Sequence, residues 1–366
     1  MTLAQPFTPF IQSIATFIAG VVKKEQVETA DDTWDTEPIN CGPYKLESWN
    51  KDSGEISWVV NEHWWGEAPT ITNVTYTYVQ DPNTQGIVYE NNEIDLLHPS
   101  DILSGQFLAG PQAEEMKPIP YGGVVFFVFN TTRAPMDDIN VRQALVKAVD
   151  MGTIVEAVFG GAQTAAFGLI SPNLSGFSDP QPTYDPEGAK AALAASSYGS
   201  AENLPPITIR VPTNLTEYVR VSEAVQQMWS ETLGITTEIS LFAQGEVRED
   251  GTSQVFRTSL GTLYADTSTS VSALGLSTGS YMMQNTMAAV PEIDEILTQA
   301  DQMPIEQQAE RDALYQEAEQ LLIEQAFYLP IIWVQYYFAV KPWVNGYASN
   351  SSLSLFTLPT MTIAEH

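Results

Sequence analysis

The chain has 366 residues, 44% of them hydrophobic, which is enough apolar material for the cores of two lobes or domains. Its single cysteine, Cys41, excludes a disulfide within the chain and a multi-cysteine zinc site. The formal net charge of −30, from 45 acidic and 15 basic residues, opposes binding to the phosphate backbone of a nucleic acid.

The first part of the chain is predicted to contain a short helix followed by antiparallel strands. Residues 10–22 are apolar, but they are too few to cross a bilayer, and no basic residue precedes them as in a secretory signal. Residues 44–49 and 55–60 alternate on either side of an Asp-Ser-Gly turn, a pattern typical of a β-hairpin. The adjacent Trp64 and Trp65 could stack on a ligand, although covering a core edge is the simpler interpretation.

The stretch of residues 124–150 is the centre of the predicted fold. The apolar run 124–129 has the length of a buried strand, and the Asn-Thr-Thr-Arg-Ala-Pro segment after it ends that strand in a loop. Asp138 and Asn140 are both possible N-caps for the following helix, in which apolar residues recur every four positions from 141 to 149. These features indicate a strand and a helix that packs back on the sheet.

Residues 207–241 predict a β-α-β unit. Two alternating segments, 207–211 and 235–241, flank a helical apolar stripe that ends at Gly234. Such crossovers imply parallel strands, and ligand sites are favoured at the carboxyl ends of parallel strands. Two helices that begin with proline, 291–300 and 304–326, are then predicted before an apolar strand region over residues 328–340.

No motif assembles convincing catalytic or metal-binding chemistry. The sequence Gly-Leu-Ser-Thr-Gly around Ser277 matches the G-x-S-x-G pattern of serine hydrolases, but the only later histidine is the terminal His366. His63 and His98 have no metal-ligand partner at helical or hairpin spacing, and no phosphate loop or dinucleotide fingerprint is present. The sequence therefore predicts a binding protein without cofactor or metal rather than an enzyme, and a serine hydrolase is the remote alternative.

Asp266 is the acidic residue that we single out. It follows a predicted strand and lies among small hydroxyl residues in GTLYADTSTS, where a carboxylate can accept hydrogen bonds from a ligand ammonium group. From the spacing alone, a solvated loop aspartate is the simpler interpretation.

Several segments resemble, in the same order, the family 5 extracellular solute-binding proteins of ABC importers, which are of the peptide, dipeptide and nickel type. They are PINCGPYKLESW with VVNEHWW, ENNEIDLL, FFVFNTTRAPMDDINVRQALVKAVD, YDPEGAKAALAASSYG, and RDALYQEAEQLLIEQAFYLPIIWVQYYFAVKPWVNGY. The resemblance implies an α/β fold with two lobes, the type II clam-shell of periplasmic binding proteins, which closes by a hinge on an extended solute. It also implies a periplasmic or extracellular location, no cofactor, and the membrane subunits of an ABC transporter as partners.

An oligopeptide is the solute that this resemblance favours, and an oligosaccharide or a metal chelate is the alternative. Family members normally have a longer N-terminal part, so part of the large lobe is expected to be missing from the sequence. We expect residues 1–117 to form the remaining large-lobe portion, residues 118–335 the second α/β lobe, and residues 336–366 the return to the large lobe, with hinge crossings near 118–123 and 335–340. A shortened chain that acts only as a structural or interaction module is the other possibility.

The resemblance also gives Asp266 a role. In this family an aspartate in a pattern like W-x-x-D-Y-x-D-P can pair with the ammonium terminus of a peptide, and Asp266 occupies its first acidic position. The match is partial, because Leu263 replaces the aromatic residue and Thr269 the second acidic residue. Tyr264 and Tyr121 flank the predicted binding loop and hinge, so we expect them in the cleft wall, with a core position as the alternative.

Overall fold

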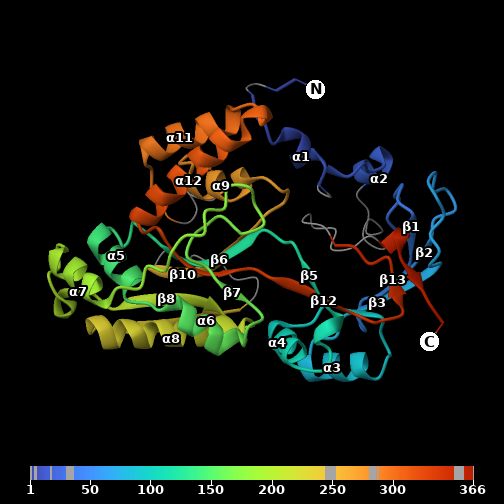
Figure 1. The fold of residues 1–366 in the computed structure, drawn as a ribbon, viewed down its shortest axis with the longest axis horizontal. Helices are drawn as coiled ribbons and strands as arrows, with labels where there is room; N and C mark the ends of the chain where they lie inside the picture. The colour runs from blue at the N-terminus through green and yellow to red at the C-terminus, as the bar shows by residue number, and fades with distance from the viewer. Residues whose placement is uncertain are drawn as a thin grey trace. The chain divides into compact units, whose positions relative to one another are not determined.

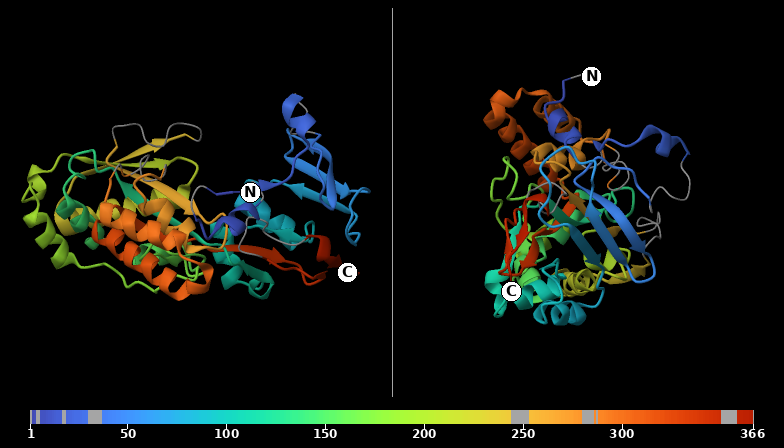
Figure 2. Two further views of the ribbon diagram at one scale, coloured as in Figure 1. Left: turned by 90° about the horizontal axis from the view of Figure 1, so that it is seen from above. Right: turned by 90° about the vertical axis from the view of Figure 1, so that its right-hand side faces the viewer.

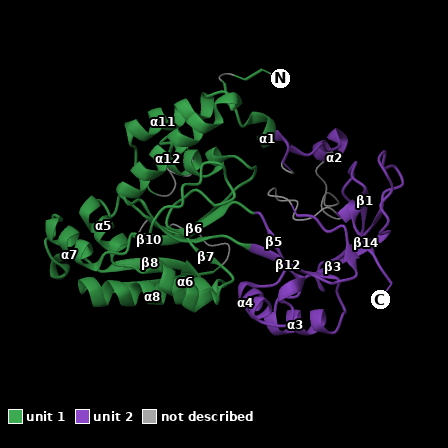
Figure 3. Ribbon diagram, in the orientation of Figure 1, with its two compact units in different colours: residues 1–13, 121–335 green, residues 14–120, 336–366 purple. Residues whose placement is uncertain are grey.

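The computed structural model describes residues 2–3, 6–16, 19–29, 37–243, 253–279, 286, 288–349 and 358–365. The chain divides into two compact units, shown in Figure 3: unit 1 comprises residues 1–13 and 121–335, and unit 2 comprises residues 14–120 and 336–366. Residues 1–13 thus group with residues 121–335. The expected segments had instead placed them with residues 14–117. Thr8 makes two of the contacts responsible, since its backbone N and its Oγ1 donate to the carbonyls of Asp301 and Met303. The assignment of segments to the lobes of a binding protein stays a prediction.

Unit 1 is built on a six-stranded sheet in the order β7-β11-β6-β10-β8-β9 (Figure 1). Its strands are β6 (Gly123–Phe129), β7 (Thr164–Ala165), β8 (Ile207–Pro212), β9 (Thr237–Phe242), β10 (Val255–Gly261) and β11 (Tyr328–Trp333). Strand β6 lies at the centre, antiparallel to both β10 and β11, and all of its residues are buried. Strands β8, β9 and β10 run parallel, as the predicted β-α-β unit requires.

Helices cover both faces of this sheet (Figure 1). They are α5 (Ile139–Lys147), α6 (Met151–Phe159), α7 (Pro186–Ala195), α8 (Thr216–Leu233), α9 (Val271–Gly275), α11 (Pro291–Gln302) and α12 (Gln308–Glu324). Val125, Phe127 and Phe129 pack in one core with apolar residues of α5 to α8. Val124, Phe126 and Val128 pack in a second core with α9, α11 and α12. The alternation of β6 therefore supplies two cores, one on each face.

Capping residues set the helix boundaries of unit 1. Asp138, rather than Asn140, caps α5, because its side chain accepts a hydrogen bond from the Asn140 N–H. Asp150 caps α6 in the same way, which divides the predicted apolar stripe between two helices. Gly160 and Gly234 end α6 and α8 with φ of 56° and 71°, in the left-handed region that glycine adopts without strain.

The described residues of unit 2 form three small sheets. The first is the meander β1 (Tyr44–Asn50), β2 (Glu55–Val60) and β3 (Asn73–Thr77), whose strands lie side by side in Figure 2. Pairing of Asn50 with Glu55 confirms the predicted hairpin. The other strands are β4 (Leu96–Leu97), β5 (Met116–Ile119) and β12 (Tyr336–Val340), in the order β4-β12-β5, and the pair β13 (Val344–Asn345) and β14 (Thr362–Ile363).

Two predictions of local structure were wrong or incomplete, and two helices were not predicted at all. The expected helix over 10–22 is only α1 (Phe10–Ile14), and a second short helix, α2 (Lys24–Thr29), follows it. The apolar region 328–340 is two strands, because β11 pairs with β6 in unit 1 and β12 pairs with β5 in unit 2. Helices α3 (Pro82–Glu90) and α4 (Asp101–Ala109) of unit 2 were not anticipated. Within the described ranges, every helix is too short or too polar to span a membrane.

Candidate functional site

One edge of the unit 1 sheet collects the carboxyl ends of four strands. Strands β8, β9 and β10 are parallel, and β10 and β11 are both antiparallel to β6, so all four end where β6 begins. The pair Gly123 and Gly261 closes the ladder of β6 and β10 at this edge. The N–H of Val334 also donates to the Gly123 carbonyl at 2.9 Å, which holds the chain after β11 beside the start of β6. Ligand sites in α/β proteins favour such edges.

Tyr121 lies across the glycine pair at this edge. A Cβ atom at Gly261 would stand 1.7 Å from the Tyr121 hydroxyl oxygen, and one at Gly123 would stand 2.6 Å from its ring carbon Cε1. The ring therefore fits only because both positions are glycine, and it is buried. The fold brings Tyr121 next to the segment that contains the two other predicted site residues. Its role in a cleft wall stays a prediction.

Asp266 is buried in an ion pair, so its interpretation as a solvated loop aspartate was wrong. Its carboxylate accepts hydrogen bonds from Nη1 and Nη2 of Arg311 at 2.7 and 2.8 Å. The side chains of Asp266 and Arg311 are 4% and 0% exposed. Oδ1 of Asp266 also accepts from the Ser268 N–H at 3.0 Å, which caps the 3-10 turn Thr267–Thr269.

Arg311 connects this loop to the two helices beneath it. Its Nε donates to the Ala300 carbonyl at the end of α11, and its Nη2 lies 2.7 Å from the Tyr315 hydroxyl. That hydroxyl donates to Asp301, which also accepts from Ser272 in α9. Burial disfavours the charge on Arg311, but the hydrogen bonds that Arg311 donates to Asp266 and its charge interactions with Asp266 and Tyr315 together outweigh burial and keep the pKa of Arg311 above its usual value. Burial raises the pKa of Asp301, because it disfavours the charged carboxylate.

Sequence reasoning missed this network. Arg311 and Tyr315 are four residues apart on α12 and therefore share one face, which was the available signal. Asp266 precedes Arg311 by 45 residues, and no local pattern joins them. The ion pair with Arg311 that anchors the predicted loop around Asp266 is thus a long-range contact.

Tyr264 lies between two fixed points of the chain. On one side, the N–H of Thr262 donates to the Gly122 carbonyl at 2.5 Å; on the other side, Asp266 is held by Arg311. Burial raises the pKa of the Tyr264 hydroxyl, and the nearby carboxyl groups of Asp266 and Asp301 raise it further. Leu263, by contrast, is exposed.

The main chain of residues 263–265 is available for new hydrogen bonds. The Tyr264 carbonyl accepts from the Asp266 N–H at 2.9 Å. In the described part of the chain, the N–H groups of Leu263, Tyr264 and Ala265 have no hydrogen-bond acceptor. An anchored segment with free main-chain donors can bind the backbone of another peptide.

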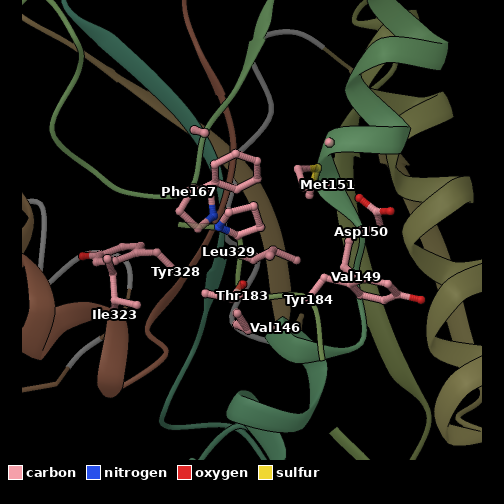
Figure 4. Close-up of a pocket in the computed structure, with 14 residues that line it drawn as sticks. Val146, Val149, Asp150, Met151, Phe167, Thr183, Tyr184, Ile323, Tyr328 and Leu329 are labelled. Carbon is pink, nitrogen blue, oxygen red and sulfur yellow. The ribbon is translucent and has the colours of Figure 1, made fainter. Parts of the chain in front are cut away.

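A small cavity lies elsewhere in unit 1 (Figure 4). It has a volume of about 100 Å³ and is lined mainly by apolar side chains of the α5–α6 junction, the 182–184 loop and β11, including Met151, Phe167, Tyr184 and Tyr328. None of the predicted site residues lines it. Its size suits a few water molecules rather than an extended solute.

The geometry does not support a serine hydrolase at Ser277. Its N–H and Oγ both bond to the Asp294 carboxylate, at 2.7 and 2.5 Å, which ties the turn after α9 to α11. No strand leads into this turn, as a nucleophile elbow requires, because the preceding element is α9. His98 packs in unit 2 against Tyr336 and Phe338, and His366 is outside the described residues.

Metal ligands do not cluster in the described part of the chain. No group of three or more His, Cys, Asp or Glu side chains there could hold a metal ion.

Comparison with known proteins gives consistent matches. The family model described as bacterial extracellular solute-binding proteins, family 5 Middle, matches residues 1–282. The chain is 29% identical over 256 residues to the dipeptide-binding protein of Escherichia coli K12, covering 67% of this chain and 47% of that protein. It is 26% identical over 392 residues to the periplasmic oligopeptide-binding protein OppA of the same organism, covering 100% of this chain and 68% of that protein.

A solved structure agrees with these matches. The murein tripeptide binding protein MppA of Escherichia coli superposes with a TM-score of 0.84 at 26% identity, covering 100% of this chain and 72% of that chain. The fold is therefore the α/β fold of two-lobed periplasmic binding proteins, as expected. The chain spans about half of the dipeptide-binding protein and about two thirds of OppA.

Proposed function

The chain belongs to the family 5 bacterial extracellular solute-binding proteins, and from this premise we propose that it captures an oligopeptide for an ABC importer. Members of this family are periplasmic or extracellular, and they bind solutes without catalysing a reaction. Three similar proteins are named for a dipeptide, an oligopeptide and a murein tripeptide, which supports a peptide as the solute.

The observation that carries the proposal is the main chain of residues 263–265 at the carboxyl edge of the unit 1 sheet, whose N–H groups have no acceptor among the described residues. Thr262 and Asp266 anchor the two ends of this segment. A peptide backbone that pairs with these groups gains hydrogen bonds at little cost in ordering the protein, because the segment is already fixed. Main-chain pairing also accepts many side chains, as an oligopeptide carrier requires.

Asp266 is the proposed partner of the positive end of the peptide. The cluster around Arg311 contains two carboxyl groups, Asp266 and Asp301, but one guanidinium group. Each carboxylate oxygen has two lone pairs, so the contacts with Arg311 leave Asp266 able to accept a further hydrogen bond. An ammonium group that approaches this end of the segment meets negative charge that one arginine does not fully balance.

Calorimetric titration with alanine peptides of two to five residues tests the proposal. We expect binding of peptides with a free N terminus, and a loss of at least about tenfold for N-acetylated peptides, since a charge-assisted hydrogen bond disappears. Asp266→Asn should show the same loss with the free peptides. Asp52→Asn, a change at an exposed turn of unit 2, is the matched control and should leave the affinity unchanged.

Two results would argue against the proposal. If no peptide gives a heat signal with the folded protein, the chain does not carry oligopeptides. If Asp266→Asn folds normally and binds free peptides as well as the unaltered protein does, the ammonium role of Asp266 is wrong while peptide capture stands. Circular dichroism of each variant separates loss of binding from loss of folding.

A further inference from the structure

Two of the places where the chain passes between the units lie side by side, and we call them the paired crossings. One joins β5 to β6, and the other joins β11 to β12. On the unit 1 side, the Val334 N–H donates to the Gly123 carbonyl; on the unit 2 side, Tyr336 pairs with Ile119. Between these two pairs the main chain has left one sheet and has not entered the next. Its polar groups there need partners other than strand ladders.

An amide side chain takes the place of strand pairing at Gln335, the last residue of unit 1. Nε2 of Gln163 donates to the Gln335 carbonyl at 3.0 Å, and Oε1 of Gln163 accepts from the Gln335 N–H at 2.8 Å. Gln163 directly precedes β7, whose pairing with β11 ends at Trp333. Its carboxamide has donors and an acceptor like a peptide group, so it extends the contact of β7 with this chain beyond the strand. Gln163 is 8% exposed, which limits competition from water.

A second amide holds the neighbouring crossing. Nδ2 of Asn173 donates to the Tyr121 carbonyl at 2.9 Å. The next carbonyl of this crossing, that of Gly122, accepts from the Thr262 N–H. The main chain is thus bonded to unit 1 at both residues that lie between the unit boundary and β6. Gln163 and Asn173 stand on either side of the short strand β7, so one stretch of unit 1 holds both crossings.

The loop that carries Asn173 is itself fixed. The Gly176 N–H donates to Oγ1 of Thr267 at 3.1 Å, and Oγ of Ser270 donates to the Leu169 carbonyl at 2.5 Å. These contacts lie on both sides of Asn173, and they join its loop to the turn that follows the proposed peptide segment. Asn173 therefore ties the crossing to an anchored part of unit 1.

We propose that Gln163 and Asn173 are positioning residues for solute capture, because their amides restrict bending at the paired crossings to the few main-chain torsions that remain. This inference rests on the proposed function. A crossing that is ordered beforehand loses little conformational entropy when a peptide is captured. Without one of the amides, a further residue of the crossing has to be ordered on capture, which corresponds to a loss in affinity of about 5- to 30-fold.

Pulsed electron paramagnetic resonance tests the restriction itself. Spin labels are attached through Glu223→Cys in α8 of unit 1 and Ile87→Cys in α3 of unit 2, both at exposed positions, after Cys41→Ser removes the native thiol. We expect Gln163→Met and Asn173→Ala each to broaden the distribution of distances between the labels in the absence of peptide. Asn173 is exposed, so its replacement leaves the core intact.

Calorimetric titration with tetraalanine measures the consequence for capture. Gln163→Met and Asn173→Ala should each bind it about 5- to 30-fold more weakly than the unaltered protein does. Gln226→Met is the matched control, because Nε2 of Gln226 also donates to a main-chain carbonyl of unit 1. That carbonyl belongs to Thr237 at the start of β9, at the opposite edge of the sheet from the crossings. The control should leave both the distance distribution and the affinity unchanged.

The outcomes separate this inference from the proposed function. Unchanged distance distributions in folded Gln163→Met and Asn173→Ala overturn the inference, and so does a broadening that Gln226→Met reproduces. Broadened distributions without loss of affinity also overturn it, since the amides would then restrict movement without aiding capture. In all three cases peptide capture stands if the unaltered protein binds tetraalanine. If the unaltered protein binds no peptide, the proposed function fails and the positioning role fails with it, whatever the distance distributions show.

Discussion

The six-stranded sheet of unit 1 and the three-stranded sheet β1–β3 of unit 2 follow similar sequence rules but reach different degrees of burial. In unit 1 every residue of β6 is buried, because helices cover both faces of the sheet. In β1–β3 the pairing register places apolar side chains on one face, namely Tyr44, Leu46, Trp49, Ile56, Trp58, Val60, Val74 and Tyr76. Of this set only Tyr44 is buried.

The difference shows what an alternating pattern does and does not specify. Alternation decides which face of a strand is apolar, and the register aligns the apolar faces of neighbouring strands. It does not provide the layer that covers the face. In unit 1 that layer comes from helices elsewhere in the chain, whereas the hydrophobic cores of the described residues contain no member of β1, β2 or β3.

The largest predicted effect concerns the covered sheet. Phe127→Ala should lower the free energy of unfolding of unit 1 by about 3–5 kcal/mol, because it removes a fully buried ring and leaves a cavity. Trp58→Ala in β2 removes a larger but partly exposed ring, so it should lower the free energy of unfolding by clearly less than Phe127→Ala does. Guanidinium denaturation, with hydrogen exchange of peptides from β6 and β2 to assign each transition, measures both. Equal losses would show that the two sheets are covered alike.

The buried ion pair of unit 1 should contribute more to stability than the exposed ion pair of unit 2. Arg311→Met leaves the buried Asp266 carboxylate unpaired and should cost about 3–5 kcal/mol. Lys45→Met breaks a pair with Glu62 in which the two side chains are 42% and 59% exposed, and it should cost less than about 1 kcal/mol. The same denaturation experiment compares the two variants, which introduce the same side chain. A small effect at Arg311 would mean that Asp266 finds water or another partner.

The apolar face of β1–β3, which is partly exposed among the described residues, should bind an apolar probe. Trp49→Thr combined with Tyr76→Thr removes two side chains that are 39% and 55% exposed, so stability should change by less than about 1 kcal/mol. Fluorescence of an anilinonaphthalene sulfonate dye should fall, because the apolar patch becomes smaller. Thr75→Ser, on the polar face of the same strand, is the control and should leave the fluorescence unchanged. Unchanged fluorescence in the double variant would show that the dye binds at a site other than the apolar face of β1–β3.

The smallest predicted effect is a pH dependence of opposite sign in the two units. Burial raises the pKa of Glu319, despite hydrogen bonds from the Leu169 and Ile170 N–H groups that lower it. The folded state of unit 1 therefore holds this proton more tightly than the unfolded chain. Its stabilising contribution is present below the ordinary carboxyl pKa and is lost as pH rises through the raised value. Glu319→Gln should accordingly gain stability relative to the unaltered protein as pH rises above about 4.

Glu62 of unit 2 is the matched comparison for Glu319. A hydrogen bond from Lys45 lowers the pKa of Glu62, so its contribution is present above the ordinary carboxyl pKa and is lost as pH falls. Any loss of stability that Glu62→Gln shows relative to the unaltered protein should therefore disappear as pH falls through the ordinary carboxyl pKa. Denaturation curves between pH 3 and pH 8 measure both variants. Parallel pH profiles of the two variants would contradict the assigned directions.

Most elements with strong periodicity were predictable from the sequence. The buried strand β6, the β8-α8-β9 unit and the β1–β2 hairpin follow from apolar spacing and turn residues, which act over a few positions. The helices α3 and α4 were missed. The run 328–340 was predicted as an apolar strand region because both halves are apolar, and only the different pairing partners of the two halves separate β11 from β12.

The candidate site was partly predictable. The position of Asp266 after a strand and its match to a family pattern drew attention to the right loop, and the fold places Tyr121 beside that loop. No local pattern indicated that Arg311 would bury the Asp266 carboxylate or that Arg257 would stack on Tyr218. Both contacts join residues at least 39 positions apart, beyond the reach of any local pattern.

The amino-acid sequence by itself determined the family, the α/β class and most of the buried strands and helices, because main-chain propensity, capping and apolar periodicity are local properties. Only the tertiary structure decided which charges are paired and, among the described residues, which arginine Nε has no acceptor and which apolar face stays partly exposed. These outcomes depend on how distant segments pack against one another, and burial then fixes the free energy of each charge and each exposed ring.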